Sequence, residues 1–110
     1  MKRNERKKWL KAITKRIAEQ VRPEKIVLFG SFAYGTPDRF SDIDLLVICD
    51  NPPDKKKRYL LVDTAIGKHL FPVDIIVRNS SEISRRLEIG DSFIHEILNS
   101  GKVLYESPVR

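Results

Sequence analysis

Short apolar, β-branched runs alternate along the chain with longer stretches of helical periodicity, and this alternation limits the fold more than any other feature. Runs of about four to eight such residues, bounded by turn-forming residues, are typical of buried strands. The runs lie at 25–29, 42–48 and 71–77. Because helical signals separate them, the sequence predicts an α/β (α+β) fold, in which helices flank one small mixed β-sheet.

Apolar spacing and capping residues place the helices. We expect one helix over about the first twenty residues and another that Asp54 caps and that runs to about Leu70. A short helix should follow Asn79, where Glu82 completes a capping box, and a last helix should cover 91–99. In that last helix the spacing predicts inward side chains at Phe93, Ile94, Ile97 and Leu98.

The bulk composition limits the class of protein. A chain of 110 residues with 41% apolar residues can form one hydrophobic core, so we expect a single domain over 1–110. No apolar run of about eighteen residues occurs and the first residues are charged, so we expect a cytoplasmic protein without a membrane partner. Cys49 is the only cysteine, which excludes an intramolecular disulfide and predicts a small buried residue.

Basic residues exceed acidic ones, 21 to 15, and the formal net charge of +6 favours phosphate-bearing or acidic partners. Two basic runs, at 2–11 and 55–58, carry much of this charge. Such runs usually form the solvated face of a helix, and nucleic-acid binding is the alternative interpretation. Few aromatic residues lie among them, which argues against a nucleic-acid surface.

Two aspartates open the second predicted strand. Residues i and i+2 of a strand project from one face, so Asp42 and Asp44 would direct two carboxylates to one point, with α-carbons roughly 6.5 Å apart. Like charges at that separation repel unless a cation lies between them. Hard oxygen ligands without a nearby His or Cys favour Mg²⁺ or Mn²⁺ over Zn²⁺. His69 and His95 fall within predicted helices and are interpreted as surface or boundary residues.

A third aspartate lies in the third predicted strand. Asp74 stands among apolar residues, where an unpaired buried charge would cost several kcal/mol, so we expect a compensating partner. If the second and third strands are neighbours, Asp74 joins Asp42 and Asp44, and three carboxylates could hold two metal ions about 3.5–4 Å apart. Asp74 would then also act as the general base or its relay.

A glycine and a serine, Gly30-Ser31, follow the first predicted strand, where a tight turn can expose backbone N–H groups to a phosphate. An Asp-x-Asp or a Gly-Ser is common by itself, and the joint spacing is what makes the pattern specific. Gly30-Ser31-Phe32-Ala33-Tyr34-Gly35 and Ser41-Asp42-Ile43-Asp44-Leu45-Leu46-Val47 resemble the signature of the minimal nucleotidyltransferase (MNT) family, within the DNA polymerase beta-like nucleotidyltransferase superfamily. The resemblance extends to 72–77 and 96–106.

This resemblance implies a polymerase beta-like nucleotidyltransferase fold and assigns roles to particular residues. The implied catalytic and metal-binding residues are Asp42, Asp44 and Asp74. The implied nucleotide-binding residues are Gly30, Ser31 and Ser41. Many members have Arg where this chain has Tyr34, so the charge that neutralises phosphate would come from elsewhere, for example from Arg39.

The resemblance also implies an activity, the transfer of a nucleoside monophosphate to a hydroxyl with release of pyrophosphate. A chain of this length leaves no room for an acceptor-holding domain, and short MNT proteins resemble antitoxins that add AMP to a HEPN-family toxin. We therefore expect Mg²⁺-dependent transfer of AMP from ATP to a HEPN toxin, with which the chain could form an oligomer. The alternatives are a non-catalytic toxin-binding module and an enzyme that modifies nucleic-acid ends.

Overall fold

The computed structural model describes residues 3–30, 33, 43–69 and 72–108. Its elements are, in chain order, α1 (Arg3–Val21), β1 (Lys25–Phe29), β2 (Ile43–Ile48), α3 (Lys55–Ile66), β3 (Val73–Arg78), α4 (Ser80–Glu88), α5 (Ser92–Ser100) and β4 (Lys102–Glu106). The first two predicted strands are confirmed wherever the structure describes them. None of the helices in these ranges has the length and apolar character that crossing a bilayer requires.

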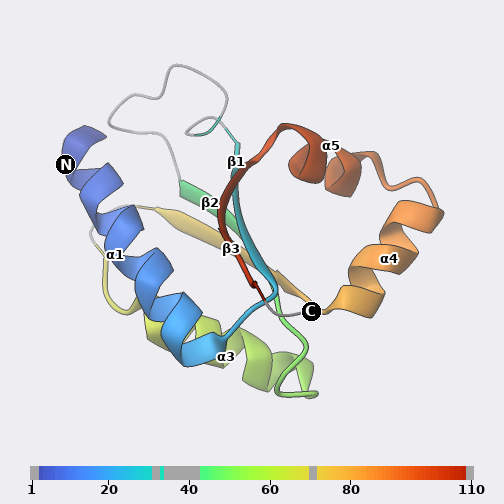
Figure 1. The fold of residues 1–110 in the computed structure, drawn as a ribbon, viewed down its shortest axis with the longest axis horizontal. Helices are drawn as coiled ribbons and strands as arrows, with labels where there is room; N and C mark the ends of the chain where they lie inside the picture. The colour runs from blue at the N-terminus through green and yellow to red at the C-terminus, as the bar shows by residue number, and fades with distance from the viewer. Residues whose placement is uncertain (1–2, 31–32, 34–42, 70–71, 109–110) are drawn as a thin grey trace.

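The strands form one mixed sheet in the order β3-β2-β1-β4 (Figure 1). β1 pairs antiparallel with β2 and with β4, whereas β2 and β3 run parallel. The central strands β1 and β2 are rich in Ile, Val and Leu because helices cover both of their faces. The sheet therefore confirms the predicted α/β (α+β) class, and it makes β2 and β3 neighbours.

Helices α1 and α3 lie on one face of the sheet, and α4 and α5 lie on the other (Figure 1). Successive residues of a strand point to opposite faces, so Leu45 packs with Ile17 of α1 while Leu46 packs with Ile83 and Ile97. All five side chains are buried. The two cores hold the sheet as a rigid middle layer, and this layer positions the candidate site.

The predicted helix caps are present. The Asp54 carboxylate accepts from the backbone N–H of Lys57 at 3.0 Å at the start of α3. The Asn79 side chain accepts from the N–H of Glu82 at 2.7 Å, and the Glu82 carboxylate accepts from the N–H of Asn79 at 3.0 Å. This reciprocal pair is the capping box that the sequence indicates, and Asp91 caps α5 in the predicted place.

Helix α3 is shorter than the sequence predicts. It ends at Ile66 because Gly67 has a φ of +74°, a conformation in which glycine readily terminates a helix. His69 therefore lies outside the helix, and the prediction that it is helical was wrong. Its ring meets Trp9 edge-on, with 6.1 Å between the ring centroids. The other histidine, His95, lies in α5 as predicted and is exposed.

Strand β3 begins at Val73, later than predicted. Pro72 precedes it and has no N–H to donate to a neighbouring strand, so regular pairing starts only after it. The Pro72 carbonyl still accepts from the Ile43 N–H at 3.1 Å, which holds the start of β3 beside the start of β2. Phe71, where the predicted strand begins, lies outside the described residues.

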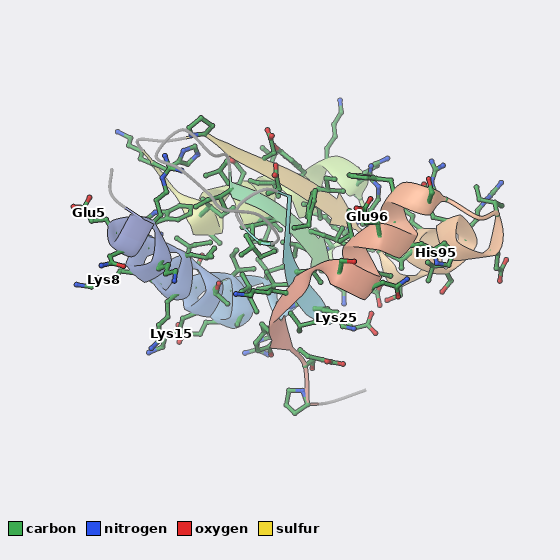
Figure 2. All side chains as sticks on the ribbon, turned by 90° about the horizontal axis from the view of Figure 1, so that it is seen from above. Glu5, Lys8, Lys15, Lys25, His95 and Glu96 are labelled. Carbon is green, nitrogen blue, oxygen red and sulfur yellow. The ribbon has the colours of Figure 1, made fainter. Side chains whose placement is uncertain are left out.

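The two basic runs are not entirely solvated. Arg6 and Arg58 are 2% and 3% exposed, so the prediction of fully solvated faces was wrong at these positions. Arg58 is buried at low cost because its Nη2 donates to Glu82 Oε1 at 3.0 Å. Lys8 and Lys15, by contrast, project from α1 into solvent, as Figure 2 shows.

Helix α5 buries a narrower face than the spacing predicts. Ile94 and Ile97 are buried and Leu98 is half-buried, but Phe93 is 50% exposed. Phe93 was predicted to point inward because its spacing to Ile97 matches one face of a helix. Adjacent helical residues differ by about 100° in direction, and only one of Phe93 and Ile94 can point fully into the sheet.

Candidate active site

Asp44 and Asp74 meet on neighbouring strands. They are paired in the parallel register of β2 and β3, and parallel strands lie about 4.8 Å apart. Asp44 alternates with Leu46 along β2, and Asp74 alternates with Ile76 along β3. Since Leu46 and Ile76 belong to the core beneath α4 and α5, both carboxylates lie on that face of the sheet.

The two carboxylates differ in exposure. Asp44 is half-buried, whereas Asp74 is exposed on β3, which is an edge strand of the sheet. The expectation that Asp74 is a buried charge in need of a partner was therefore wrong. Its apolar neighbours Val73 and Ile75 pack on the core of the opposite face, whereas Asp74 points away from that core. An exposed carboxylate beside a half-buried one is reachable by a substrate.

Gly30 fits directly against Asp44. Its φ is +78°, and a β-carbon added there would overlap Asp44 Oδ2 and lie 3.0 Å from Asp44 Cγ. The Gly30 carbonyl accepts from the Ala33 N–H at 3.0 Å, which tightens the turn after β1. Only glycine combines this backbone conformation with so close an approach to the carboxylate. The end of β1 at Gly30 therefore lies against the Asp44 carboxylate.

The remaining predicted site residues lie outside the described part of the chain. They are Ser31, Ser41 and Asp42, together with Tyr34 and Arg39. Their roles stay predictions. Among the described residues, no group of three His, Cys, Asp or Glu side chains is close enough to hold a metal ion.

The described residues fit a hard divalent cation. Asp44 and Asp74 supply carboxylate oxygens in register, and neither His nor Cys lies on this face beside them in β2 or β3. Mg²⁺ commonly uses one or two carboxylates and takes its other ligands from water and phosphate oxygens. The backbone of Gly30 lies against the same carboxylate, so a phosphate held at that turn would be close to a cation bound by Asp44.

Phe29 lies beside Asp44 and Phe93 packs on Phe29, and sequence reasoning assigned neither residue to the site. Phe29 is opposite Asp44 in the pairing of β1 with β2, and its ring meets Phe93 of α5 edge-on, with 5.8 Å between centroids. The sequence offered one signal, the aromatic residue just inside the Asp91 cap, but its apolar character favoured a core position.

A buried thiol and a surface cavity both lie apart from this site. Cys49 is buried beyond β2, and burial raises the pKa of its thiol, an effect larger than the opposing influence of the Arg58 charge. The thiol is therefore neutral and a poor nucleophile. A hollow of about 720 Å³ lies near the other end of β1 and β2, lined by residues that include Glu24, Asp50 and Ser80. Neither feature contacts the paired carboxylates.

Carboxylates in register beside a glycine turn are typical of enzymes that act on phosphate groups with a divalent cation. The family model described as Polymerase beta, Nucleotidyltransferase matches residues 11–109. The chain therefore belongs to the polymerase beta nucleotidyltransferase family. This confirms both the resemblance to the MNT proteins of that superfamily and the predicted enzyme class, nucleotidyltransferase.

Two proteins of Methanocaldococcus jannaschii are similar to this chain. The one named Putative protein adenylyltransferase MJ0141 is 32% identical over 78 residues, which cover 71% of this chain and 75% of that protein. The one named Putative protein adenylyltransferase MJ1215 is 34% identical over 77 residues, covering 70% and 90% respectively.

Solved structures share the fold. The crystal structure of a putative nucleotidyltransferase from Sulfolobus solfataricus aligns with a TM-score of 0.64 over 93% of this chain and 81% of that chain. At 22% identity it supports the fold alone. A chain from the crystal structure of a toxin-antitoxin with AMP-PNP aligns with a TM-score of 0.56 and 25% identity, over 91% of this chain and 74% of that one.

Proposed function

We propose that this protein transfers AMP from ATP to a hydroxyl of a partner protein, in a reaction that depends on Mg²⁺, and that the partner is a HEPN-type toxin. The observation that carries the proposal is the register of Asp44 with Asp74 on one face of the sheet. The glycine turn that approaches Asp44 supports it. On this proposal Asp42, Ser31 and Ser41 complete the site.

In the proposed reaction, the acceptor oxygen attacks the α-phosphorus of ATP, and the bond from that phosphorus to the bridging oxygen breaks. Pyrophosphate leaves with that oxygen. Asp74 is exposed, so one of its carboxylate oxygens can take the proton of the acceptor hydroxyl. Asp44, half-buried and fixed beside Gly30, holds the cation together with Asp42 and Asp74. The bound Mg²⁺ supplies charge stabilisation on the phosphate oxygens.

The relatives support the choice of acceptor. Both M. jannaschii proteins carry a name that specifies a protein as the acceptor and adenylyl as the group transferred. The toxin-antitoxin structure with AMP-PNP supports a toxin as the partner and an adenine nucleotide as the ligand. The exposed position of Asp74 on an edge strand is compatible with an acceptor as large as a folded protein.

The test incubates the purified protein with Mg²⁺ and a candidate HEPN toxin, using ATP labelled in parallel at the α or the γ phosphate. We expect α label, and no γ label, on the toxin. Asp44→Asn should abolish the labelling. Asp63→Asn is the matched control, because it makes the same change of charge at an exposed position on α3, on the opposite face of the sheet.

Each of the other outcomes would contradict a different part of the proposed function. Label from the γ phosphate alone would mean phosphoryl transfer. Neutralisation of the toxin that survives Asp44→Asn, without label, would favour the non-catalytic binding module. Labelled RNA in place of labelled protein, with RNA binding that weakens steeply as salt is added, would favour an enzyme that modifies nucleic-acid ends.

A further inference from the structure

Phe93 is a half-exposed aromatic ring near the start of α5, and it packs edge-on against Phe29 of β1. It is the second residue of the helix and is 50% exposed, while Ile94 and Ile97 provide the contacts that hold α5 on the sheet. A large exposed apolar side chain gains little for stability, and single ones are ordinary at a protein surface. What distinguishes Phe93 is its position.

One aromatic ring separates Phe93 from the carboxylates. Phe29 lies opposite Asp44 in the β1–β2 pair, and both side chains are on the face of the sheet that carries α5. Residues paired directly across antiparallel strands have α-carbons about 4.5–5.5 Å apart. The Phe93 ring then lies 5.8 Å from the Phe29 ring, centroid to centroid. Phe93 therefore packs on the residue that flanks Asp44 from β1, the neighbour of β2 on the side opposite β3.

The backbone that carries Phe93 is held in place at both ends of α5. At the start, the Asp91 carboxylate accepts from the N–H of Phe93 at 3.0 Å and from that of Ile94 at 3.1 Å. At the end, Gly101 approaches β1 so closely that an added β-carbon would lie 2.6 Å from Val27 Cγ1. The backbone that carries Phe93 is therefore fixed on the sheet and is not part of a flexible loop.

The ring geometry leaves room for a planar ligand. The Phe29 and Phe93 planes are 82° apart, so Phe29 can cover at most one face of the Phe93 ring. We propose that the adenine base of ATP stacks on the open face of Phe93, an inference that rests on the proposed function. The triphosphate would then lie between Phe93 and Asp74, along the ends of β1 and β2.

The test compares two ligands that share a triphosphate and differ in the base. ATP and inorganic tripolyphosphate are each titrated calorimetrically, with Mg²⁺, into the wild-type protein and into Phe93→Ala, Phe93→Leu and Phe93→Trp. Stacking of a base on an aromatic ring predicts that Phe93→Ala and Phe93→Leu weaken ATP binding by roughly 5- to 100-fold. Tripolyphosphate binding should change less than about twofold, and Phe93→Trp should retain the affinity for ATP.

The outcomes separate the two proposals. If the wild-type protein binds neither ligand, the nucleotide site itself is wrong and the stacking proposal falls with it. If the wild-type protein binds both, but the Phe93 variants weaken both equally or neither, only the stacking proposal is overturned. Thermal melting of each variant identifies any loss of affinity that comes from unfolding, and Asp44→Asn should weaken both ligands because it acts on the shared triphosphate.

Discussion

Gly30 shows how the backbone conformation of one residue determines the placement of a neighbouring carboxylate, that of Asp44. Its φ of +78° favours glycine, and a β-carbon there would overlap Asp44 Oδ2. Gly30→Ala should therefore displace the Asp44 carboxylate, weaken ATP binding by at least roughly tenfold, and lower the free energy of unfolding by about 2–3 kcal/mol. Calorimetric titration with ATP and Mg²⁺ measures the first effect, and urea unfolding measures the second.

Gly90 supplies the matched control for this substitution. Its φ is +79°, nearly that of Gly30, but an added β-carbon there would have no heavy atom within 4 Å. Gly90→Ala should lower the free energy of unfolding by only about 1–2 kcal/mol, the backbone cost alone, and leave ATP binding unchanged. Equal losses in the two variants would mean that contact with Asp44 is not what requires glycine at position 30.

Asp74 permits a test of metal binding that does not depend on activity. Its charge lies beside that of Asp44 on the neighbouring strand, and like charges so placed repel. In chelator, Asp74→Asn should leave the Tm unchanged or raise it by up to about 4 °C. Mg²⁺ should raise the Tm of the wild-type protein and not that of the variant, because a ligand stabilises only a state that binds it. A large drop of the variant's Tm in chelator would instead indicate a structural role.

At the scale of elements, one buried guanidinium joins α3 to α4. Arg58 donates to Glu82 Oε1 at 3.0 Å and to the Pro53 carbonyl at 2.7 Å, and Glu82 is also the acidic member of the α4 capping box. Arg58→Ala should lower the free energy of unfolding by about 2–4 kcal/mol, because it leaves a cavity and removes the donor from two partly buried acceptors.

Lys55 is the control for Arg58, since it pairs with the same carboxylate from solvent. Its Nζ lies 3.9 Å from Glu82 Oε2, and its side chain is 69% exposed. Lys55→Ala should change the free energy of unfolding by less than about 0.5 kcal/mol, as exposed ion pairs contribute little. Urea unfolding of both variants checks the difference. Similar losses of unfolding free energy in the two variants would show that the burial of Arg58 does not strengthen its pairing with Glu82.

Features that depend on residues close together in the sequence were predictable, whereas features that depend on tertiary contacts were not. The capping box at Asn79 and the strand at 25–29 follow from side chains close together in the sequence. The burial of Arg58 and the exposure of Phe93 follow from what packs against each residue in three dimensions. The basic run therefore assigned Arg58, and the apolar spacing Phe93, to the wrong environment.

In the candidate site, too, the spacing of the motif was visible in the sequence and the tertiary neighbours were not. The spacing of Gly30, Asp42 and Asp44 is visible in the sequence and predicted a phosphate and metal site. Whether Asp74 belongs to it depended on strand order, which one sequence does not reveal. The parallel pairing of β2 with β3 brings Asp44 and Asp74 side by side, while the roles of all three aspartates stay predictions.

At the scale of the whole molecule, the sheet order separates the approaches of the two proposed substrates. Phe93, on which the base is proposed to stack, packs on Phe29 of β1, whereas Asp74 lies on β3, an edge strand from which the proposed partner protein would bring its hydroxyl. Hydrogen–deuterium exchange should therefore slow at the start of α5 when ATP and Mg²⁺ are added, and slow along Val73–Arg78 only when the toxin is added. The other edge strand, β4, is the internal control and should be unchanged by either addition. Slower exchange along β4 on addition of the toxin, without a change along β3, would mean that the acceptor approaches from elsewhere.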